Sequence, residues 1–176
     1  VEKYKNVYWS KFESLYYPGD YAIKDSDGYL WLLGRSDDVL KVAGHRIGTA
    51  ELESSIVSHN DVAESAVCGI PDDVKGESII AFVVLKENVH ATDDTLRSEL
   101  RDTIRTQIGP IATPSQFYIV TKLPKTRSGK IMRRLLKSIA NNETIGDVST
   151  LEDGAAVSEI QSTFNELQKN IQNQKN

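Results

Sequence analysis

The chain has 176 residues, a formal net charge of −4, 39% hydrophobic residues and 26% charged residues. This length suits one domain of ordinary size with appendages, and the charge gives no global field that would draw the protein to nucleic acid or membrane. One cysteine and three histidines exclude an internal disulfide framework and give no metal-ligand cluster. No apolar stretch approaches the roughly 20 residues that span a bilayer, and no signal peptide opens the chain, so we expect a cytoplasmic protein.

The first 36 residues are rich in aromatic side chains and contain one hairpin signal. Asp25-Ser-Asp-Gly28 separates two strand-like runs, 21–23 and 29–33. A lone hairpin is marginal in water, so we expect residues 1–36 to lean on a part of the protein that is absent here, or to be partly disordered. Because the chain begins at Val1 in the middle of this pattern, we expect it to be a fragment of a longer protein.

The following segment, residues 37–142, alternates strand and helix patterns. A second short hairpin is expected around Ala43-Gly44, and the run 79–85 is apolar enough to be buried on both faces. Thr49 and Thr92 are the expected N-caps of two helices, the second ending at Gly109-Pro110. The expected strands are 39–42, 45–47, 62–70, 78–85 and 117–120, and the expected helices are 49–58, 92–108 and 131–140. This order predicts an α+β fold, in which a small mixed sheet of about three core strands is flanked by helices, with a short hairpin after a hinge.

The last segment, residues 143–176, is dominated by Asn, Gln, Ser and Thr. One helical pattern runs from 157 to 171, with apolar residues at Ile160, Phe164, Leu167 and Ile171. We expect a polar tail with a loosely docked helix and a frayed end.

A basic run extends from Lys122 to Lys137, with seven basic residues and no acid. Thr126, Ser128 and Gly129 form a flexible turn that places Lys130 at the start of a helix, where backbone N–H groups face outward. A lysine on such a loop can swing into a site and meet a polyanion or a carboxylate. The same composition also fits a solvated helix face, a nuclear-localisation signal or a nucleic-acid patch.

Other short motifs offer groups that bind nucleotides or phosphates. Tyr17-Pro-Gly-Asp20 places a carboxylate at a tight turn, which suits a pair of ribose hydroxyls. Gly34-Arg35-Ser-Asp37-Asp38 sets a fixed cation beside two acids, and the glycines of 44–48 let the backbone approach a ligand closely. A stripe of arginines on one helix could hold a phosphate: Arg97, Arg101 and Arg105. Each of these motifs, taken singly, also has a structural explanation without a ligand. In the same order, these are turn chemistry, a surface ion pair worth under about 1 kcal/mol, an ordinary hairpin and a solvent-facing stripe.

In this order and spacing, the motifs resemble the adenylate-forming superfamily of acyl-CoA synthetases, firefly-type luciferases and peptide-synthetase adenylation domains. The blocks that carry the resemblance are 17–20 with Asp27-Gly28, 34–53 and 123–130. The stretches 44–51, 108–114 and 127–134 are similar to the acetyl- and propionyl-CoA synthetase group in particular. The resemblance extends to about Leu151.

The resemblance implies a two-step reaction for the parent enzyme. Acetate or a similar short acid, with propionate and 3-hydroxypropionate as alternatives, reacts with MgATP to give an acyl-adenylate and pyrophosphate, and CoA then gives acyl-CoA and AMP. It also implies the site residues: Lys130 for adenylation, Asp20, Arg35 and Arg46 for ATP and AMP, Gly44 and Arg105 for CoA, and Asp37 as the hinge.

The same resemblance implies how the chain is divided. Residues 1–36 would end an N-terminal adenylation domain that binds most of the ATP and Mg²⁺ and selects the acid, 37–142 would be a mobile C-terminal domain, and 143–176 a tail. We expect no turnover by this fragment alone. Lys130 is also the expected target of a lysine acetyltransferase and a deacetylase, since acetylation removes its charge. The rival hypothesis is a binding module that uses the basic run on RNA or an acidic partner.

Overall fold

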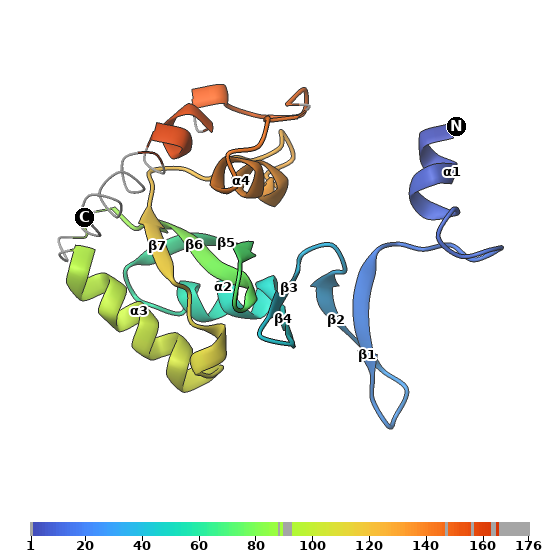
Figure 1. Cartoon of the computed structure of the whole chain (residues 1–176), viewed down its shortest axis with the longest axis horizontal. Helices are drawn as coiled ribbons and strands as arrows, with labels where there is room; N and C mark the ends of the chain where they lie inside the picture. Colours follow the sequence, from blue (N-terminus) through green and yellow to red (C-terminus); the bar gives the residue numbers. More distant parts are fainter. Residues whose placement is uncertain are drawn as a thin grey trace. The chain divides into compact units, whose positions relative to one another are not determined.

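The structure is a computed structural model that describes residues 2–87, 89, 93–146, 148–155, 157–162 and 165. The contacts between residues divide the chain into two compact units, Val1–Val39 and Leu40–Asn176. Figure 1 gives the labels of the helices and strands in the two units. Among the described residues, no helix is both long and apolar enough to cross a membrane.

The first unit contains a short helix, α1 (Glu2–Tyr8), and the predicted hairpin of β1 (Asp20–Lys24) and β2 (Leu30–Arg35). The two strands are antiparallel, with Asp20 opposite Arg35 and Lys24 opposite Leu30. The turn forms because the Asp25 carboxylate accepts hydrogen bonds from the Asp27 and Tyr29 backbone N–H groups and from the Trp31 indole. Strand β1 is exposed along its whole length and α1 has no buried residue, so this unit has little core of its own.

The second unit is built on a five-stranded sheet. Three strands form its centre as predicted: β5 (Val62–Asp72), β6 (Gly76–Leu85) and β7 (Gln116–Ile119). Strand β6 pairs antiparallel with β5 and parallel with β7. The predicted second hairpin, β3 (Val39–Val42) and β4 (His45–Gly48), extends the same sheet, since Val42 pairs with Gly76 of β6.

Helices cover both faces of this sheet (Figure 1). Along β6, Ile79, Ala81 and Val83 pack in one core with α2 (Thr49–Val57) and α3 (Asp93–Gln107). Ile80 and Phe82 point to the other face and pack in a second core with α4 (Arg133–Ala140) and the helical residues 157–162. The prediction that this strand is buried on both faces is confirmed.

The helices differ from their predicted limits at their starts. Thr49 is the first residue of α2 and buried, and Gly48 holds the N-cap position, so the prediction of a Thr49 cap is wrong. Helix α4 begins at Arg133 rather than at residue 131, so Lys130 lies in the loop that precedes it. The predicted Thr92 cap lies outside the described residues. The end of α3 is as predicted: the chain turns at Gly109, with a φ of 129°, into the 3-10 helix η1 (Pro110–Ala112).

The tail contributes to the second core. Val157 is 8% exposed and Ile160 is fully buried, so residues 157–162 pack against the second core, as part of the predicted docked helix. The rest of the predicted helix, apart from residue 165, lies outside the described residues. In the same core the Cys68 thiol is buried, and burial raises its pKa to about 12, as expected for a small apolar core residue.

Candidate functional site

Arg35 links Asp20, the predicted ribose-binding acid, to Asp37, the predicted hinge residue. Its Nη1 atom lies 3.5 Å from Asp20 Oδ1, and its Nε atom donates to Asp37 Oδ1 at 3.0 Å. Its Nη1 group also donates to the Pro18 carbonyl at 2.8 Å. Hydrogen bonding to Asp37 raises the pKa of Arg35, which stays a cation.

The side chains of this cluster are open to solvent, with exposed fractions of 48% for Arg35, 42% for Asp20 and 70% for Asp37. Exposed pairs of this kind add at most about 1 kcal/mol to stability. Their oxygen and nitrogen atoms are accessible to a ligand. The cluster therefore contributes little to folding, and its polar atoms are open to solvent.

Gly19 shapes the same cluster. It has a φ of 80°, and a Cβ atom added there would lie 2.8 Å from Arg35 Nη2. Only glycine meets both demands without moving the arginine. The Tyr17 hydroxyl shares a hydrogen bond with Ser36 Oγ, and the Ser36 N–H donates to the Gly19 carbonyl at 2.8 Å. These bonds tie the start of β1 to the end of β2.

Lys130 lies on a tight hairpin of residues 124–132 in the second unit. The hairpin closes through two backbone bonds, from the Thr126 N–H to the Lys130 carbonyl at 2.8 Å and from the Met132 N–H to the Pro124 carbonyl at 2.8 Å. The Lys130 N–H donates to Thr126 Oγ1 at 3.1 Å, and Gly129 takes a φ of 79° at the turn. The Lys130 side chain is exposed, and its ammonium has no hydrogen bond or ion pair within the described part of the chain.

The hairpin is followed at once by a partly buried ion pair. Arg133, the first residue of α4, donates from Nε to Glu53 Oε1 at 2.7 Å and from Nη2 to Glu53 Oε2 at 2.5 Å. Glu53 also accepts the Val67 N–H of β5 at 2.9 Å. Because the Glu53 side chain is only 11% exposed, this two-pronged contact fixes the start of α4 against α2 and β5.

Most of the basic run is neutralised by acids from other parts of the chain. Lys122, Lys125, Arg133 and Lys137 pair respectively with Asp153, Glu64, Glu53 and Glu77. Arg134 also has a partner. Of the seven basic side chains, only those of Arg127 and Lys130 have no polar partner among the described residues, and both are exposed. The run is therefore not a continuous cationic patch, which argues against the nucleic-acid hypothesis.

Gly44 forms the turn between β3 and β4. Ala43 and Gly44 have φ values of 47° and 83°, as in the two-residue turns that favour glycine. A Cβ atom added at Gly44 would meet nothing within 4 Å, so the conformation and not close packing requires glycine. The Ala43 N–H donates to the Lys75 carbonyl at 2.7 Å, and the turn is thereby held by the β5–β6 connection.

Glu77 supports this hairpin from β6. One of its oxygens accepts the Lys41 N–H at 2.6 Å, and the other lies 3.6 Å from Lys137 Nζ on α4. Arg46 on β4 is exposed and has a polar partner of its own.

The arginine stripe of α3 divides into two parts. Arg97 donates to the Phe117 carbonyl at 3.2 Å, and the Arg101 guanidinium lies 5.9 Å from the centre of the Phe117 ring. These two arginines pack on β7. Arg105, in the last turn of α3, is exposed and remains the candidate phosphate ligand.

The predicted site residues thus fall into separate groups. Asp20, Arg35 and Asp37 come together in the first unit, while Lys130 and Gly44 occupy two different hairpins of the second. Sequence patterns did not identify the residues that hold these hairpins, Glu53 and Glu77. Their partners lie far away in the sequence, and an isolated glutamate gives no local signal.

A family comparison matches residues 51–130 to the AMP-binding enzyme C-terminal domain. Over 166 residues the chain is 61% identical to an acetyl-coenzyme A synthetase of Pyrobaculum aerophilum, covering 94% of this chain and 25% of that protein. It is 51% identical over 170 residues to a 3-hydroxypropionyl-coenzyme A synthetase of Metallosphaera sedula, covering 97% and 25%. The chain thus spans about a quarter of the length of these relatives.

Solved structures show the same fold. The anthranilate CoA ligase AuaEII, in complex with anthranoyl-AMP, superposes with a TM-score of 0.69 at 36% identity, over 80% of this chain and 27% of that one. The acetoacetyl-CoA synthetase of Streptomyces lividans superposes with a TM-score of 0.79 over 96% of this chain and 25% of that one. Its identity is 22%, so this second likeness concerns the fold alone.

Proposed function

This chain belongs to the C-terminal domains of AMP-binding, adenylate-forming CoA ligases, and from that premise we propose that the complete protein is an AMP-forming acetyl-CoA synthetase. In this proposal the protein activates acetate with MgATP and transfers the acetyl group to CoA. The 61% identity to an acetyl-coenzyme A synthetase supports acetate as the acid. The observation that carries the role of this domain is the exposed Lys130 ammonium, on a hairpin whose neighbouring cations are mostly paired with acids.

In the first step a carboxylate oxygen of acetate attacks the α-phosphorus of ATP, and pyrophosphate leaves. The Lys130 ammonium would meet the carboxylate and the phosphate oxygens and offset the negative charge that gathers there. Asp20 would accept hydrogen bonds from the ribose hydroxyls. Arg35 and Arg46 would contact the nucleotide. The Mg²⁺ that accompanies ATP is assigned to the N-terminal adenylation domain, the partner of this domain in the complete chain.

In the second step the CoA sulfur attacks the carbonyl carbon of acetyl-adenylate, and AMP leaves with the bonding electron pair. The Gly44 hairpin presents open backbone next to which the pantetheine arm can lie. Arg105 would bind a CoA phosphate. Because Lys130 and Gly44 are on different hairpins of the same unit, presenting each in turn requires the domain to rotate, and Asp37 is the proposed hinge.

The lysine assignment is tested with the complete enzyme in two assays, acetate-dependent ATP–pyrophosphate exchange and thioester formation from supplied acetyl-adenylate. We expect Lys130→Ala to slow exchange by about 10²–10³-fold, the usual effect of removing one preorganised charge-stabilising donor, and to retain thioester formation. Arg127→Ala is the matched control, since it removes an exposed cation from the same hairpin. Normal exchange in Lys130→Ala would overturn the proposal.

The hinge is tested by fixing the backbone of residue 37. Asp37→Pro should leave exchange largely intact and slow thioester formation, because the domain reaches only one of its two orientations. An equal loss of both half-reactions would refute the hinge.

A second candidate substrate is 3-hydroxypropionate, favoured by the 51% identity to a 3-hydroxypropionyl-coenzyme A synthetase. Exchange assays with acetate, propionate and 3-hydroxypropionate at equal concentration separate these acids. The acid with the highest kcat/KM identifies the substrate.

The exposure of Lys130 also supports control by reversible acetylation, which would take place in the cytoplasm through a lysine acetyltransferase and a deacetylase. An N-acetyl group removes the positive charge that adenylation needs. Complete enzyme acetylated at Lys130 should lose exchange and regain it after deacetylation. Full exchange by the acetylated enzyme would exclude this control.

A further inference from the structure

The tail lies against the hairpin that carries Lys130. The Arg127 N–H donates to the Thr150 carbonyl at 3.1 Å, and the Glu152 N–H donates to the Lys125 carbonyl at 2.9 Å. Between these bonds, Thr126 and Leu151 form an antiparallel bridge. Residues 125–127 therefore pair on one edge with their own hairpin and on the other edge with the tail segment, defined as residues 148–153.

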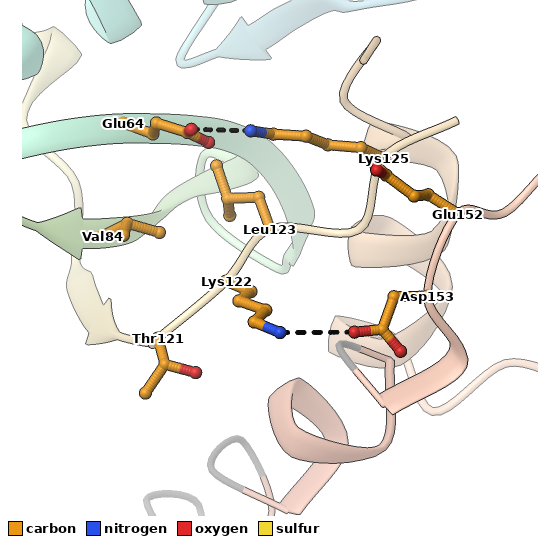
Figure 2. Close-up of a pocket in the computed structure, with 8 residues that line it drawn as sticks. All are labelled: Glu64, Val84, Thr121, Lys122, Leu123, Lys125, Glu152 and Asp153. Carbon is orange, nitrogen blue, oxygen red and sulfur yellow. Dashed lines mark hydrogen bonds and ion pairs between the residues drawn. The ribbon is translucent and has the colours of Figure 1, made fainter. Parts of the chain in front are cut away.

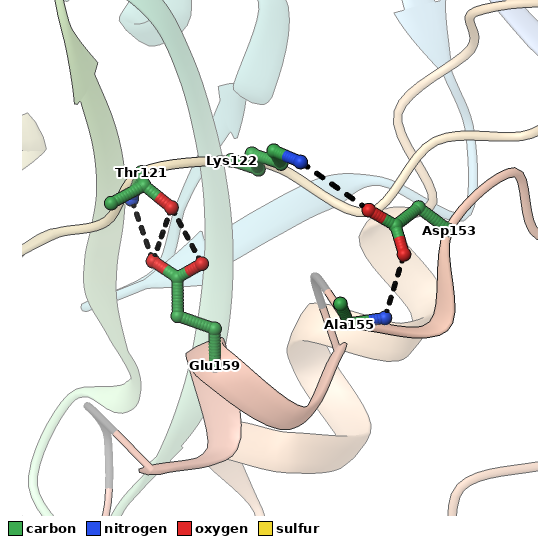
Figure 3. Close-up of polar contacts among 5 residues, drawn as sticks. All are labelled: Thr121, Lys122, Asp153, Ala155 and Glu159. Carbon is green, nitrogen blue, oxygen red and sulfur yellow. Dashed lines mark hydrogen bonds and ion pairs between the residues drawn. The ribbon is translucent and has the colours of Figure 1, made fainter.

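The tail segment is itself fastened on both sides of these bonds. Leu151 packs against the second core, in which Val157 and Ile160 are buried. Asp153 lies 3.4 Å from Lys122 Nζ and accepts the Ala155 N–H at 2.8 Å (Figure 3). Glu159 accepts hydrogen bonds from the Thr121 N–H at 2.9 Å and from its hydroxyl, also drawn in Figure 3.

Polar and apolar side chains of the tail, of residues 121–125 and of the neighbouring strands line a pocket of about 280 Å³ (Figure 2). Its lining includes Glu64, Lys122, Lys125, Glu152 and Asp153. Besides the packing of Leu123 and Leu151 in the second core, the tail is joined to residues 121–127 by separate hydrogen bonds and ion pairs. Each of these contacts can be removed by a single substitution.

The Lys130 hairpin is anchored at its two ends, and its turn is exposed. Leu123 and Pro124 are buried before it, and Arg133 is held by Glu53 after it. Between these anchors the residues 127–130 are exposed. Outside the hairpin itself, the bonds that hold residues 125–127 include those from the tail segment and the contact of Lys125 with Glu64.

We propose that the tail segment, with Glu159, positions Lys130 for adenylation, so that the tail is a functional part of the adenylation machinery. This inference rests on the proposed role of Lys130. None of the tail residues touches the reacting atoms; they act through the backbone of residues 125–127. Loosening them widens the range of positions that the lysine ammonium samples, and misplacement of a charge-stabilising group slows the step that uses it. Thioester formation uses the other hairpin and stays as it was.

The test compares paired variants of the complete enzyme. Glu152→Pro removes the N–H that bonds to Lys125. Thr144→Pro is its control, because the Thr144 N–H donates no bond within the described residues. Glu159→Ala removes the acceptor for Thr121, and Glu159→Gln restores one acceptor oxygen. The control for Glu159→Ala is Glu143→Ala, which removes an exposed tail carboxylate that has no hydrogen bond or ion pair within the described residues.

We expect Glu152→Pro and Glu159→Ala to slow ATP–pyrophosphate exchange by about three- to tenfold, the effect of losing one net hydrogen bond from a positioned group. Thioester formation should stay within twofold of the wild type, and Glu159→Gln should recover most of the exchange. Amide hydrogen exchange in residues 125–130 should rise in the two affected variants, while that of β5 and β6 stays unchanged.

Equal slowing of both half-reactions, or slowing by the two controls, would reduce the tail to a general structural role and overturn the inference. Normal exchange in Glu152→Pro and Glu159→Ala would overturn it as well. Lys130→Ala, measured beside them, separates the two ideas. If Lys130→Ala lacks exchange while the tail variants are normal, the proposed function stands and the positioning role fails. If Lys130→Ala is itself normal, the proposed function fails.

Discussion

Arg133 donates two parallel hydrogen bonds to the carboxylate of Glu53, a residue eighty positions earlier in the chain. The pair joins the first residue of the helix after the Lys130 hairpin to the helix that follows the Gly44 hairpin. The Lys130 hairpin and the Gly44 hairpin are therefore followed by two helices that this one side-chain contact joins.

We expect Arg133→Ala to lower the free energy of unfolding of the second unit by about 3 kcal/mol, because it leaves the nearly buried Glu53 carboxylate without its cation. The matched control is Arg127→Ala, an exposed residue of the same run, which should change stability by less than about 0.5 kcal/mol. Both tryptophans, Trp9 and Trp31, are in the first unit, so urea unfolding should be followed by far-UV circular dichroism.

The double variant Glu53→Gln, Arg133→Met separates the loss of the pair from the exposure of a lone charge. It should be more stable than Arg133→Ala, since no buried carboxylate is left unpaired. A double variant as unstable as Arg133→Ala would contradict the electrostatic explanation.

Glu77 offers a second stability test, because it joins β3 to α4. Glu77→Ala should lower the free energy of unfolding by about 1–3 kcal/mol, because the Lys41 N–H loses its acceptor. The substitution also removes the carboxylate, 23% exposed, that packs beside Gly69. Glu77→Gln keeps one acceptor oxygen and should lose less. Lys137→Ala removes only the longer, exposed ion pair and should cost less than about 1 kcal/mol. A larger loss in Lys137→Ala than in Glu77→Ala would place the main contact at α4 instead.

Gly44→Ala tests whether the turn needs glycine for its backbone conformation alone. We expect a loss of about 1–2 kcal/mol, because an alanine at a φ of 83° is strained even though the space beside it is open. Gly44→Asn should be milder, as asparagine tolerates this region. Gly154→Ala is the control. A Cβ atom added at Gly154 also meets nothing within 4 Å, and the φ of Gly154 is not positive. Because Gly154 begins a helical stretch, the change to alanine should be neutral or slightly stabilising. Equal losses at the two glycines would exclude the conformational explanation.

The Asp153 contact should depend on pH in a defined direction. The Ala155 N–H first, and then Lys122, hold the pKa of the Asp153 carboxyl below its ordinary value of 3.8. A lowered folded-state pKa means that the carboxylate stabilises the tail fully above the unfolded pKa, and that this contribution disappears as the pH falls through the folded pKa. The difference in amide protection of Ala155 between the wild type and Asp153→Ala should therefore be present at pH 6 and should decrease as the pH falls below the ordinary carboxyl pKa of 3.8. A difference that is constant over this range would show that the charge has no part in it.

The sequence by itself determined the local elements of this protein. A continuous apolar run predicted β6, and four-residue apolar spacing predicted α3, in which Leu96, Leu100 and Ile104 are all fully buried. Turn chemistry predicted both hairpins, because each turn is selected by hydrogen bonds and φ angles within a few residues. The first turn depends on Asp25 and Gly28, and the second on Ala43 and Gly44. The starts of α2 and α4 were less well predicted. Thr49 is the buried first residue of α2 and not its N-cap, and residues 131 and 132 pair within the Lys130 hairpin instead of starting α4.

Only the tertiary structure decided which charges of the basic run are compensated and what holds Lys130 in place. Glu53, Glu64, Glu77 and Asp153 reach that run from α2, β5, β6 and the tail respectively, and none of them is near it in the sequence except Asp153. Ion pairs depend on distances in space, which local patterns do not encode. For the same reason the polar tail gave no sign that its backbone would bond to residues 125–127, since a backbone bond between distant segments requires no particular side chain.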